Sequence, residues 1–462
     1  MRLKFLLPLF CLLLPSGGRL HAQTGPDGNN VISSEAEMNV ELDCFVGGAS
    51  VWKITPGEVE SSFAKKGFAW LDEGTKTRGV IRPRDLLLKS STPSGVTFKP
   101  GKGLRHKLTL FGATAYEATL EFSGDKLATV TISIWNKGDA GQSTSKPAFE
   151  YMVGQTVASM DTVLKSRGRD LGRDNSGAAK LSRWRWETPD TLAQLEHSSG
   201  KDEDRSFVGD FIRLRFAPKG GMRMDSTVAA PGKLGVAALA TRVKKTAEGD
   251  VYVEGVPMVD QGEKGYCAVA STERVMRYYG IQVDQHDLAK AAETSQYGTR
   301  PQDFEDAIHR LQGRFKIRVR DLITFDQRDY ERIVDNYNRE AKKAGMPQWE
   351  PGDYYFKFNA DIMREARCRA GAFEKFRTMI TTATSRGVPL LWALSLGRYP
   401  ETGRENPQGG GGHMRTIIGY NAKTDEVIFS DSWGAGHEIK KMKGRDACAA
   451  TNGLYLVEPA AN

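Results

Sequence analysis

Two spacings of apolar residues recur along the chain, and they predict different elements in different stretches. Between residues 40 and 216, short runs that alternate apolar and polar positions suit half-buried strands. Two helices interrupt these runs, one opened by the capping sequence Thr55–Glu58 and one at 148–164. This order of helix, strands, helix and strands predicts a strand-rich α+β region. The region could consist of two copies of one α+β unit. The strands are predicted at 107–111, 116–122, 127–135, 180–187, 192–197 and 206–216.

The helical spacing dominates the C-terminal half. Apolar residues from Val269 to Tyr279 repeat at intervals of three and four, which predicts a half-buried helix over 268–279 that ends at Gly280. The apolar run at 389–396 is typical of a strand buried on both faces, and residues 414–430 indicate a strand, a turn and a second strand. Further helices are predicted to begin at Asp284 and at the capping box Thr299–Gln302, and to cover 326–344 and 360–386, the last with a bend near Gly371.

The stretch between the two halves contains few large apolar residues. Gly220-Gly221 and Pro231-Gly232 stand in it, and such pairs mark turns and linkers. We therefore divide the chain near residue 235, into an α+β domain at 23–235 and a second domain at 236–462. The linker at 217–250 is also a candidate site for self-cleavage.

The N-terminus has the layout of a secretory signal peptide. Arg2 and Lys4 precede the apolar run Phe5–Leu14, and small residues end the segment at Ala22. The run is too short for a membrane anchor, which needs about 20 apolar residues. We expect cleavage after Ala22 and export of the protein, either to the periplasm or to the medium, with no integral membrane segment.

Charge and cysteine content limit the ligands, metal sites and disulfides that we expect in this protein. Removal of the three basic residues of the signal lowers the net charge from +8 to +5 (8 − 3), which is a weak bias in a chain of this length. It gives no reason to expect nucleic-acid binding. Neither C-x-x-C nor H-x-x-x-H spacing occurs, so we expect no zinc site and no cofactor. The mature chain keeps Cys44, Cys267, Cys368 and Cys448, of which Cys368 and Cys448 are the pair to test for a disulfide.

One motif of the N-terminal half invites a functional interpretation. Arg183-Trp184-Arg185-Trp186 alternates cations with aromatic rings, as a sugar- or nucleic-acid-stacking strip would. A strand with its tryptophans on the core face explains the same alternation, and we favour it. No chemistry is predicted from residues 23–235.

The candidate chemistry lies in the C-terminal half and begins at Cys267. This residue stands at the predicted start of the helix 268–279, where free backbone N–H groups and the helix dipole favour a thiolate. Gln261 lies six residues earlier, before a turn that contains two glycines, and is placed to donate a side-chain N–H to an oxyanion. A thiolate nucleophile needs a base and a group that orients the base.

His413 and Asp431 supply these two groups. They stand nine residues on either side of the predicted turn near residue 422, so a hairpin would make them neighbours. The Asp431 carboxylate can then hold one nitrogen of the imidazole and leave the other free to take a proton from Cys267. Trp433 is placed to cover that hydrogen bond. His286, His309 and His437 have no comparable arrangement, and we interpret them as incidental.

These residues together resemble the papain-like cysteine peptidases. The resemblance rests on Gln261-Gly-x-x-Gly-Tyr-Cys267-Ala, on His413 at a strand start and on Asp431-Ser-Trp-Gly434, within residues 250–458. It is closer to the C39-like group of bacteria, in which an aspartate commonly replaces the asparagine of papain. The resemblance implies a two-lobed domain with a helical lobe, an antiparallel β lobe and the site in the cleft between them. It also implies hydrolysis of a protein or peptide substrate through an acyl-enzyme. Lys264 departs from the pattern, since papain has a disulfide cysteine there.

Two other functions remain open. A transglutaminase or an amidase-type acyl transferase uses the same Cys–His–Asp constellation with a different acyl acceptor. A non-catalytic exported binding protein on a papain-like scaffold is the third possibility, disfavoured because both reacting groups are intact. The sequence does not indicate the substrate, the oligomeric state or the role of residues 23–235.

Overall fold

The structure is a computed structural model of the chain. The predicted signal peptide at 1–22 and the middle of the predicted linker lie outside the residues that it describes. The described residues are 39–83, 85–92, 95–105, 107–141, 144–202, 204–220, 236–324, 327–350 and 358–460. Both halves of the chain combine helices with strand-rich sheets, so the fold class is α+β, as the sequence predicts.

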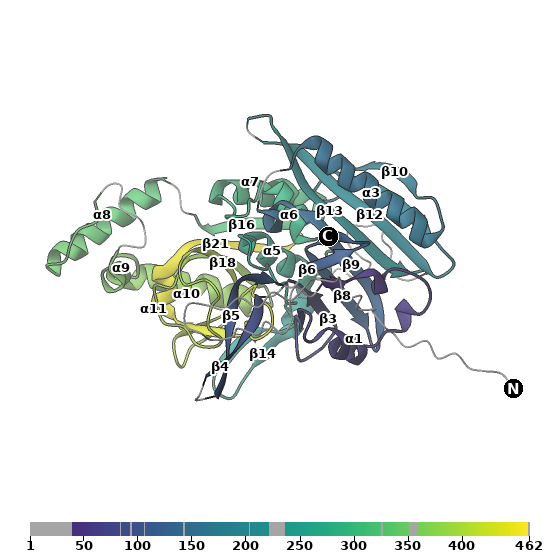
Figure 1. The fold of residues 1–462 in the computed structure, drawn as a ribbon. Helices are drawn as coiled ribbons and strands as arrows, with labels where there is room; N and C mark the ends of the chain where they lie inside the picture. Colours follow the sequence, from purple (N-terminus) through teal and green to yellow (C-terminus); the bar gives the residue numbers. More distant parts are fainter. Residues whose placement is uncertain are drawn as a thin grey trace.

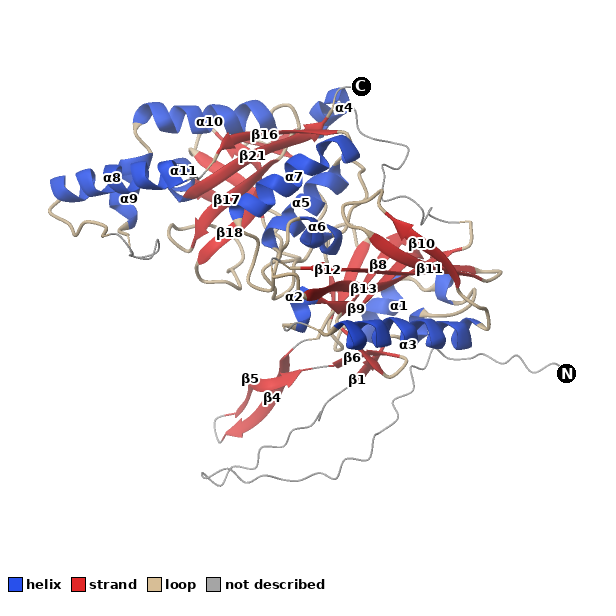
Figure 2. Ribbon diagram, turned by 90° about the horizontal axis from the view of Figure 1, so that it is seen from above, coloured by secondary structure: helices blue, strands red, loops and turns tan. Residues whose placement is uncertain are grey.

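One antiparallel sheet of eight strands forms the N-terminal half (Figures 1 and 2). Helix α1 (Pro56–Phe63) precedes the four strands at one edge, and α3 (Lys146–Leu164) precedes the four at the other. The last strand of each group, β9 or β13, lies in the middle, where the two pair. The strands follow the order β10 (Arg169–Asp174), β11 (Leu181–Glu187), β12 (Thr191–Lys201), β13 (Phe207–Pro218), β9 (Lys126–Asn136), β8 (Glu117–Ser123), β3 (Arg78–Ile81) and β2 (Phe68–Trp70).

The apolar face of this sheet packs against α3 and α1. Residues such as Val130, Leu195 and Leu214 are fully buried there, with Phe149 and Met160 of α3. The capping box expected at Thr55 is present, with reciprocal bonds between Thr55 and Glu58. The remaining elements are η1 (Asp43–Phe45), η2 (Val51–Lys53), α2 (Lys137–Ala140), a three-stranded sheet of β1 (Asn39–Glu41), β6 (Lys107–Leu110) and β7 (Ala113–Ala115), and the pair β4 (Asp85–Thr92) and β5 (Gly95–Arg105).

The Arg-Trp alternation belongs to this core. Trp186 is buried, and its Nε1 donates to Asp161 Oδ1 of α3 at 2.6 Å. The ring of Trp184 stacks on His197 of the neighbouring strand. Both tryptophans are thus occupied by structural contacts.

A second antiparallel sheet forms the C-terminal half. Strand β17 lies in its interior and is buried along almost its whole length, as expected from its apolar run. The sheet follows the order β14 (Val243–Lys245), β15 (Asp250–Val253), β18 (Gly411–Asn421), β17 (Leu390–Leu396), β21 (Thr451–Pro459) and β16 (Ile317–Ile323), with β19 (Glu426–Ser430) paired to β18 and β20 (Lys440–Lys443).

Helices surround this second sheet. Among those that the structure describes, none is long and apolar enough to cross a bilayer. Helix α8 projects away from the body of the molecule (Figures 1 and 2), and it shares with α9 a small apolar cluster that includes Trp349 and Met363. The helices are α4 (Val236–Leu239), η3 (Ala240–Arg242), α5 (Cys267–Tyr278), α6 (Gln285–Ala291), α7 (Pro301–Phe315), α8 (Gln327–Lys343), α9 (Ala360–Arg367), α10 (Ala370–Thr384) and α11 (Gly444–Ala450).

Two predictions about helix ends are wrong. Helix α7 is capped by Arg300 and not by Thr299, because Arg300 precedes Pro301 and takes the extended conformation that proline imposes. The expected helix at 360–386 is two helices, with a break at Cys368 and Arg369 instead of a bend at Gly371. The Cys368 thiol donates to the Arg445 carbonyl at 3.2 Å, which ties the break to the start of α11.

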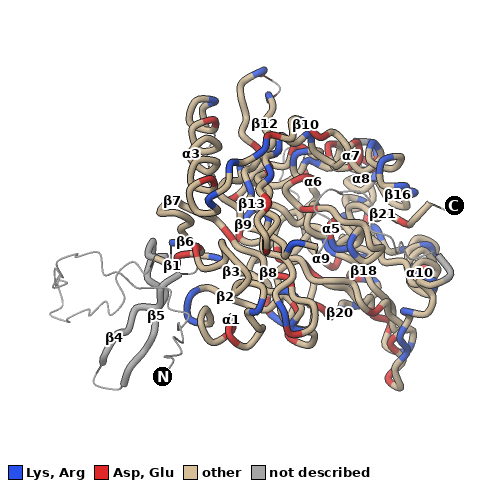
Figure 3. Tube along the Cα trace, turned by 90° about the vertical axis from the view of Figure 1, so that its right-hand side faces the viewer, with Lys and Arg blue, Asp and Glu red and all other residues tan. Residues whose placement is uncertain are grey.

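Ion pairs join the two halves of the chain. Figure 3 shows both signs where β8 and β13 approach α5 and α6. Arg213 of β13 pairs with Asp287 of α6 at 3.0 Å, and Arg277 of α5 pairs with Glu121 of β8 at 3.0 Å. The eight-stranded sheet is therefore docked on the first helices of the C-terminal half.

Candidate active site

Cys267 is the first residue of α5. The residue before it, Tyr266, supplies no side-chain cap, so the first N–H groups of the helix are left for other acceptors. Cys267 is half-buried, whereas the residues that follow it in the first two turns of α5 are buried. Ser271 Oγ donates to the Met414 carbonyl at 3.1 Å and fixes this end of α5 against β18.

The structure brings His413 and Asp431 together. His413 lies near the start of β18, and Asp431 directly follows β19, the other strand of the predicted hairpin. His413 Nε2 is 2.7 Å from Asp431 Oδ1, and neither side chain is exposed to solvent. The ring of Trp433 stacks on His413 with 4.3 Å between ring centroids, so it covers the imidazole as the sequence analysis expects.

The second ring nitrogen of His413 is not used by Asp431. Nδ1 of His413 is buried and makes no ordinary hydrogen bond within the described structure. Cys267 and His413 nevertheless lie close enough for each group to change the pKa of the other. Catalytic hydrogen bonds are often long in a free enzyme and tighten when substrate binds.

The pKa shifts favour an ion pair. Burial by itself raises the pKa of Cys267, but the charge of His413 and its contact with the sulfur bring the pKa below the ordinary thiol value. Burial lowers the pKa of His413, but Asp431 and Cys267 together raise it to about 9. The pKa of Asp431 is held far below its usual range, since the charges of His413 and Arg415 outweigh burial. This arrangement stabilises a thiolate beside an imidazolium.

Arg415 is a part of the site that the sequence analysis missed. Its Nε donates to Asp431 Oδ2 at 2.6 Å, on the oxygen that His413 does not use. Its Nη1 and Nη2 donate to Glu401 at 2.5 and 3.1 Å, and Lys440 Nζ donates to the same carboxylate at 2.9 Å. Arg415 is two residues from His413 on one strand, so both side chains lie on the same face. The spacing of two residues from His413 is therefore the sequence feature that could have identified Arg415.

Arg274 holds the backbone of Asp431 from the other side. This residue lies two turns beyond Cys267 on α5 and is buried. Its Nη1 donates to the Asp431 carbonyl at 2.7 Å and its Nε donates to the Pro257 carbonyl at 2.9 Å. Burial lowers the pKa of Arg274 to about 10, and the Asp431 charge opposes this shift. The helix of the cysteine and the strand end of the aspartate are thus joined directly.

Gln261 is buried beside this junction. Its backbone N–H donates to the Ser432 carbonyl at 2.8 Å, and its Oε1 accepts a hydrogen bond from Ser432 Oγ at 2.7 Å. One N–H of Nε2 donates to the Lys264 carbonyl at 3.1 Å. The amide carries a second N–H, which leaves one donor for another acceptor.

His437 lies closer to the site than the sequence suggests. Its carbonyl accepts from the Asp431 N–H at 2.8 Å, and its ring meets Trp433 edge to face. Burial lowers the pKa of His437 to about 4, so the ring is neutral at physiological pH. It packs against the aromatic cover of the site.

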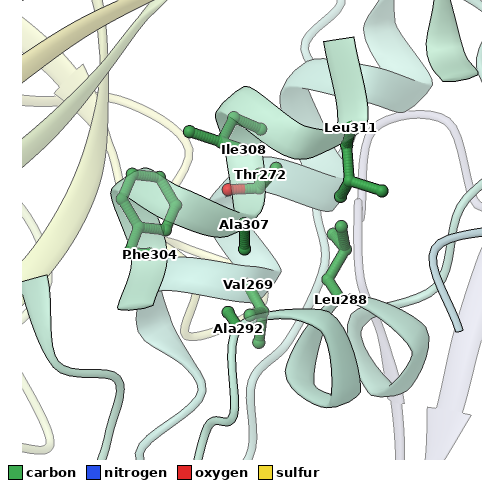
Figure 4. A pocket seen from close by; sticks show the side chains of 8 residues that line it. All are labelled: Val269, Thr272, Leu288, Ala292, Phe304, Ala307, Ile308 and Leu311. Carbon is green, nitrogen blue, oxygen red and sulfur yellow. The ribbon is translucent and has the colours of Figure 1, made fainter. Parts of the chain in front are cut away.

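A small pocket beside α5 offers no chemistry of its own. It lies between α5, α6 and α7 (Figure 4), and its lining is apolar except for Thr272, whose hydroxyl donates to the Ala268 carbonyl at 2.8 Å. In the described ranges, no group of three or more His, Cys, Asp or Glu side chains is arranged to hold a metal ion. The polar groups around Cys267 are therefore the candidate site. The pocket is lined by Val269, Thr272, Leu288, Ala292, Phe304, Ala307, Ile308 and Leu311.

Comparison with known proteins gives a match in the C-terminal half. Residues 253–452 match the family model described as the Peptidase_C39 like family. The C-terminal half is a C39-like, papain-like peptidase domain. The peptidase domain of Streptococcus ComA, described as a bi-functional ABC transporter involved in a quorum sensing pathway, is a solved structure with 12% identity and a TM-score of 0.24. That match covers 44% of this chain and 99% of the ComA domain. No curated protein matches the chain.

Proposed function

We propose that the protein is an exported cysteine peptidase that cleaves protein or peptide substrates. Cys267 is the nucleophile, His413 the general base and acid, Asp431 the residue that orients His413, and Gln261 an oxyanion donor. The observation that carries the proposal is the buried 2.7 Å hydrogen bond between His413 and Asp431 beside a cysteine whose pKa is lowered. The C39-like family of the domain supports the same chemistry.

The proposed reaction has two halves. In the first, the Cys267 thiolate attacks the peptide carbonyl carbon, and the carbonyl oxygen becomes an oxyanion that accepts hydrogen bonds from Gln261 and the Cys267 N–H. The C–N bond then breaks, and the leaving amine takes the proton of His413. In the second, His413 removes a proton from water, and the hydroxide attacks the thioester and expels the thiolate. The products are a carboxylic acid and an amine.

The two-lobed arrangement is part of this proposal. Helices α5, α6 and α7 would form one lobe and the sheet around β17 and β18 the other, with substrate held between them. The division at residue 235 and removal of residues 1–22 on export belong to the same proposal.

Cleavage of a peptide library by the wild-type protein and by Cys267→Ala tests the proposal. We expect cleavage by the wild type and its loss in Cys267→Ala. Cys44 is also half-buried but lies in the N-terminal half, so Cys44→Ala is a matched control that should keep full activity. Equal cleavage by Cys267→Ala would contradict the assignment. Preferential incorporation of an added amine over hydrolysis would favour an acyl transferase instead.

A further inference from the structure

The residues just before Cys267 are held by the N-terminal half of the chain. We call Asp260–Tyr266 the Gln261 segment. Arg82, which follows β3, donates from Nη2 to the Asp260 carbonyl at 2.7 Å, and its Nη1 lies 2.9 Å from Asp260 Oδ1. Glu117 at the start of β8 accepts from the same Nη2 at 2.6 Å. The beginning of the segment is thus bonded to Arg82, which Glu117 of β8 holds in place.

Lys264 attaches the middle of the segment to the same half. Its Nζ donates to Asp139 Oδ2 at 2.5 Å and lies 3.8 Å from Glu117 Oε2. The Lys264 side chain is 1% exposed, so both carboxylates act on a buried ammonium. The carbonyl of Lys264 is the acceptor for Gln261 Nε2. A chain of two contacts therefore runs from Asp139 to the amide of Gln261.

The fit around Lys264 leaves little room for movement. A Cβ added to Gly138 of α2 would lie 2.7 Å from the Lys264 side chain and 2.6 Å from the ring of Tyr266. Asp139 is itself fixed, because Asn136 Nδ2 donates to its Oδ2 and Asn136 Oδ1 accepts its N–H, both at 2.8 Å. The N-terminal half thus presents a preformed surface to the segment.

We propose that Asp139 and Glu117 are positioning residues that the N-terminal half supplies to the active site. They fix Lys264, and through its carbonyl they fix the amide of Gln261. This inference rests on the proposed function of Gln261. An oxyanion donor acts only within about 2.7–3.1 Å of the developing charge, so a small shift of the segment weakens catalysis. Without its carboxylates, the buried ammonium of Lys264 would be unpaired, and the segment would move to expose it.

Asp139→Asn and Glu117→Gln remove the two charges with little change in shape. Glu121→Gln is the matched control, since Glu121 lies on the same strand and face as Glu117 but pairs with Arg277, at the end of α5 far from Cys267. For Asp139→Asn we expect kcat to fall roughly tenfold to hundredfold with KM little changed, because the donor acts in the transition state. Binding of a peptide aldehyde, whose adduct carries the oxyanion, should weaken by a similar factor.

Three measurements separate positioning from other effects. The alkylation rate of Cys267 should stay at the wild-type value, since His413 and Asp431 are untouched. Amide hydrogen exchange of residues 260–266 should accelerate in Asp139→Asn and not in Glu121→Gln, and this measurement needs no substrate. In a Lys264→Met background, Asp139→Asn should reduce kcat no further, because both act through one contact.

The outcomes decide between the two proposals. Unchanged exchange at 260–266 and an unchanged kcat in Asp139→Asn would overturn the positioning role. Accelerated exchange in a chain whose wild type cleaves no peptide would support positioning and contradict the peptidase. If Asp139→Asn does not fold, Gly138→Ala gives the second test, since its methyl group displaces Lys264 and should produce the same changes.

Discussion

At the scale of single residues, activity depends on how one proton is shared. The pKa of Cys267 is lowered and that of His413 is raised to about 9. The thiolate and the imidazolium therefore coexist at pH values above the pKa of Cys267 and below that of His413. We expect kcat/KM to rise with the titration of Cys267 below the ordinary thiol value of 9.0 and to fall as His413 loses its proton near pH 9. A pH–rate profile measures both limbs.

The variant Asp431→Asn tests whether His413 causes the fall of kcat/KM at alkaline pH. The carboxylate raises the pKa of His413, so its removal should move this limb to lower pH and reduce kcat. A profile that rises once, with a midpoint at the value of an ordinary thiol, would show that no ion pair forms.

Arg415 should stabilise the fold as well as the site. It is buried between two carboxylates, and Arg415→Met would leave Asp431 and Glu401 facing each other without it. Removing one partner of a buried pair costs about 3–5 kcal/mol. Arg445 pairs with Glu365 at the surface, so Arg445→Met should cost less than about 1 kcal/mol. Urea unfolding compares the two, and an equal loss in both variants would exclude the structural role of Arg415.

A contact between two side chains could be predicted from the sequence where both residues belong to one hairpin. His413 and Asp431 stand on either side of one local turn, so the sequence alone predicts that they meet. Arg415 was within reach of the same argument. Glu401 and Lys440 come from separate stretches and reach Arg415 only through the fold, so no local pattern identifies them.

At the scale of elements, the end of α10 is set by a glycine. Gly387 has φ of +78°, and a Cβ there would lie 2.0 Å from the Leu239 carbonyl oxygen. Gly387→Ala should therefore destabilise the fold by at least about 1–2 kcal/mol. Gly371 in the same helix has open space, and Gly371→Ala should stabilise it by up to about 1 kcal/mol. Thermal unfolding should shift in opposite directions, and shifts of the same sign would contradict this account.

Elements with a strong local pattern were predicted closely. Helix α5 and the strands β17, β18 and β19 fall where apolar spacing places them. The break between α9 and α10 was not predictable, because no proline or glycine stands at Cys368 or Arg369. That break is tied to a contact with Arg445, which lies 77 residues further along the chain.

At the scale of the whole molecule, the two halves should stay together if the chain is cut. Arg213 and Glu121 of the eight-stranded sheet pair with helices α6 and α5, and Lys264 before α5 pairs with Asp139 of α2. Buried pairs are screened little by salt. After cleavage within 217–250, whether by the protein itself or by an added protease, we expect both fragments to co-elute in gel filtration in about 1 M salt. Separate elution would show that docking needs the intact linker.

This docking was beyond the reach of sequence analysis. The pattern of apolar residues predicts that residues 23–235 form a strand-rich α+β region, but it gives no role for them. The contacts that supply a role join residues far apart in the chain, such as Asp139 and Lys264, 125 positions apart. Lys264 stands where papain has a disulfide cysteine, and its buried partners become visible only in the fold.

Labelling with an epoxide inhibitor of the E-64 type tests the central claim most directly. Mass spectrometry of the intact protein and of its peptides measures how many labels are bound and where. We predict one label per molecule, on Cys267, with peptide hydrolysis lost in proportion to labelling. A label on another residue, or hydrolysis that continues after Cys267 is fully labelled, would contradict the account.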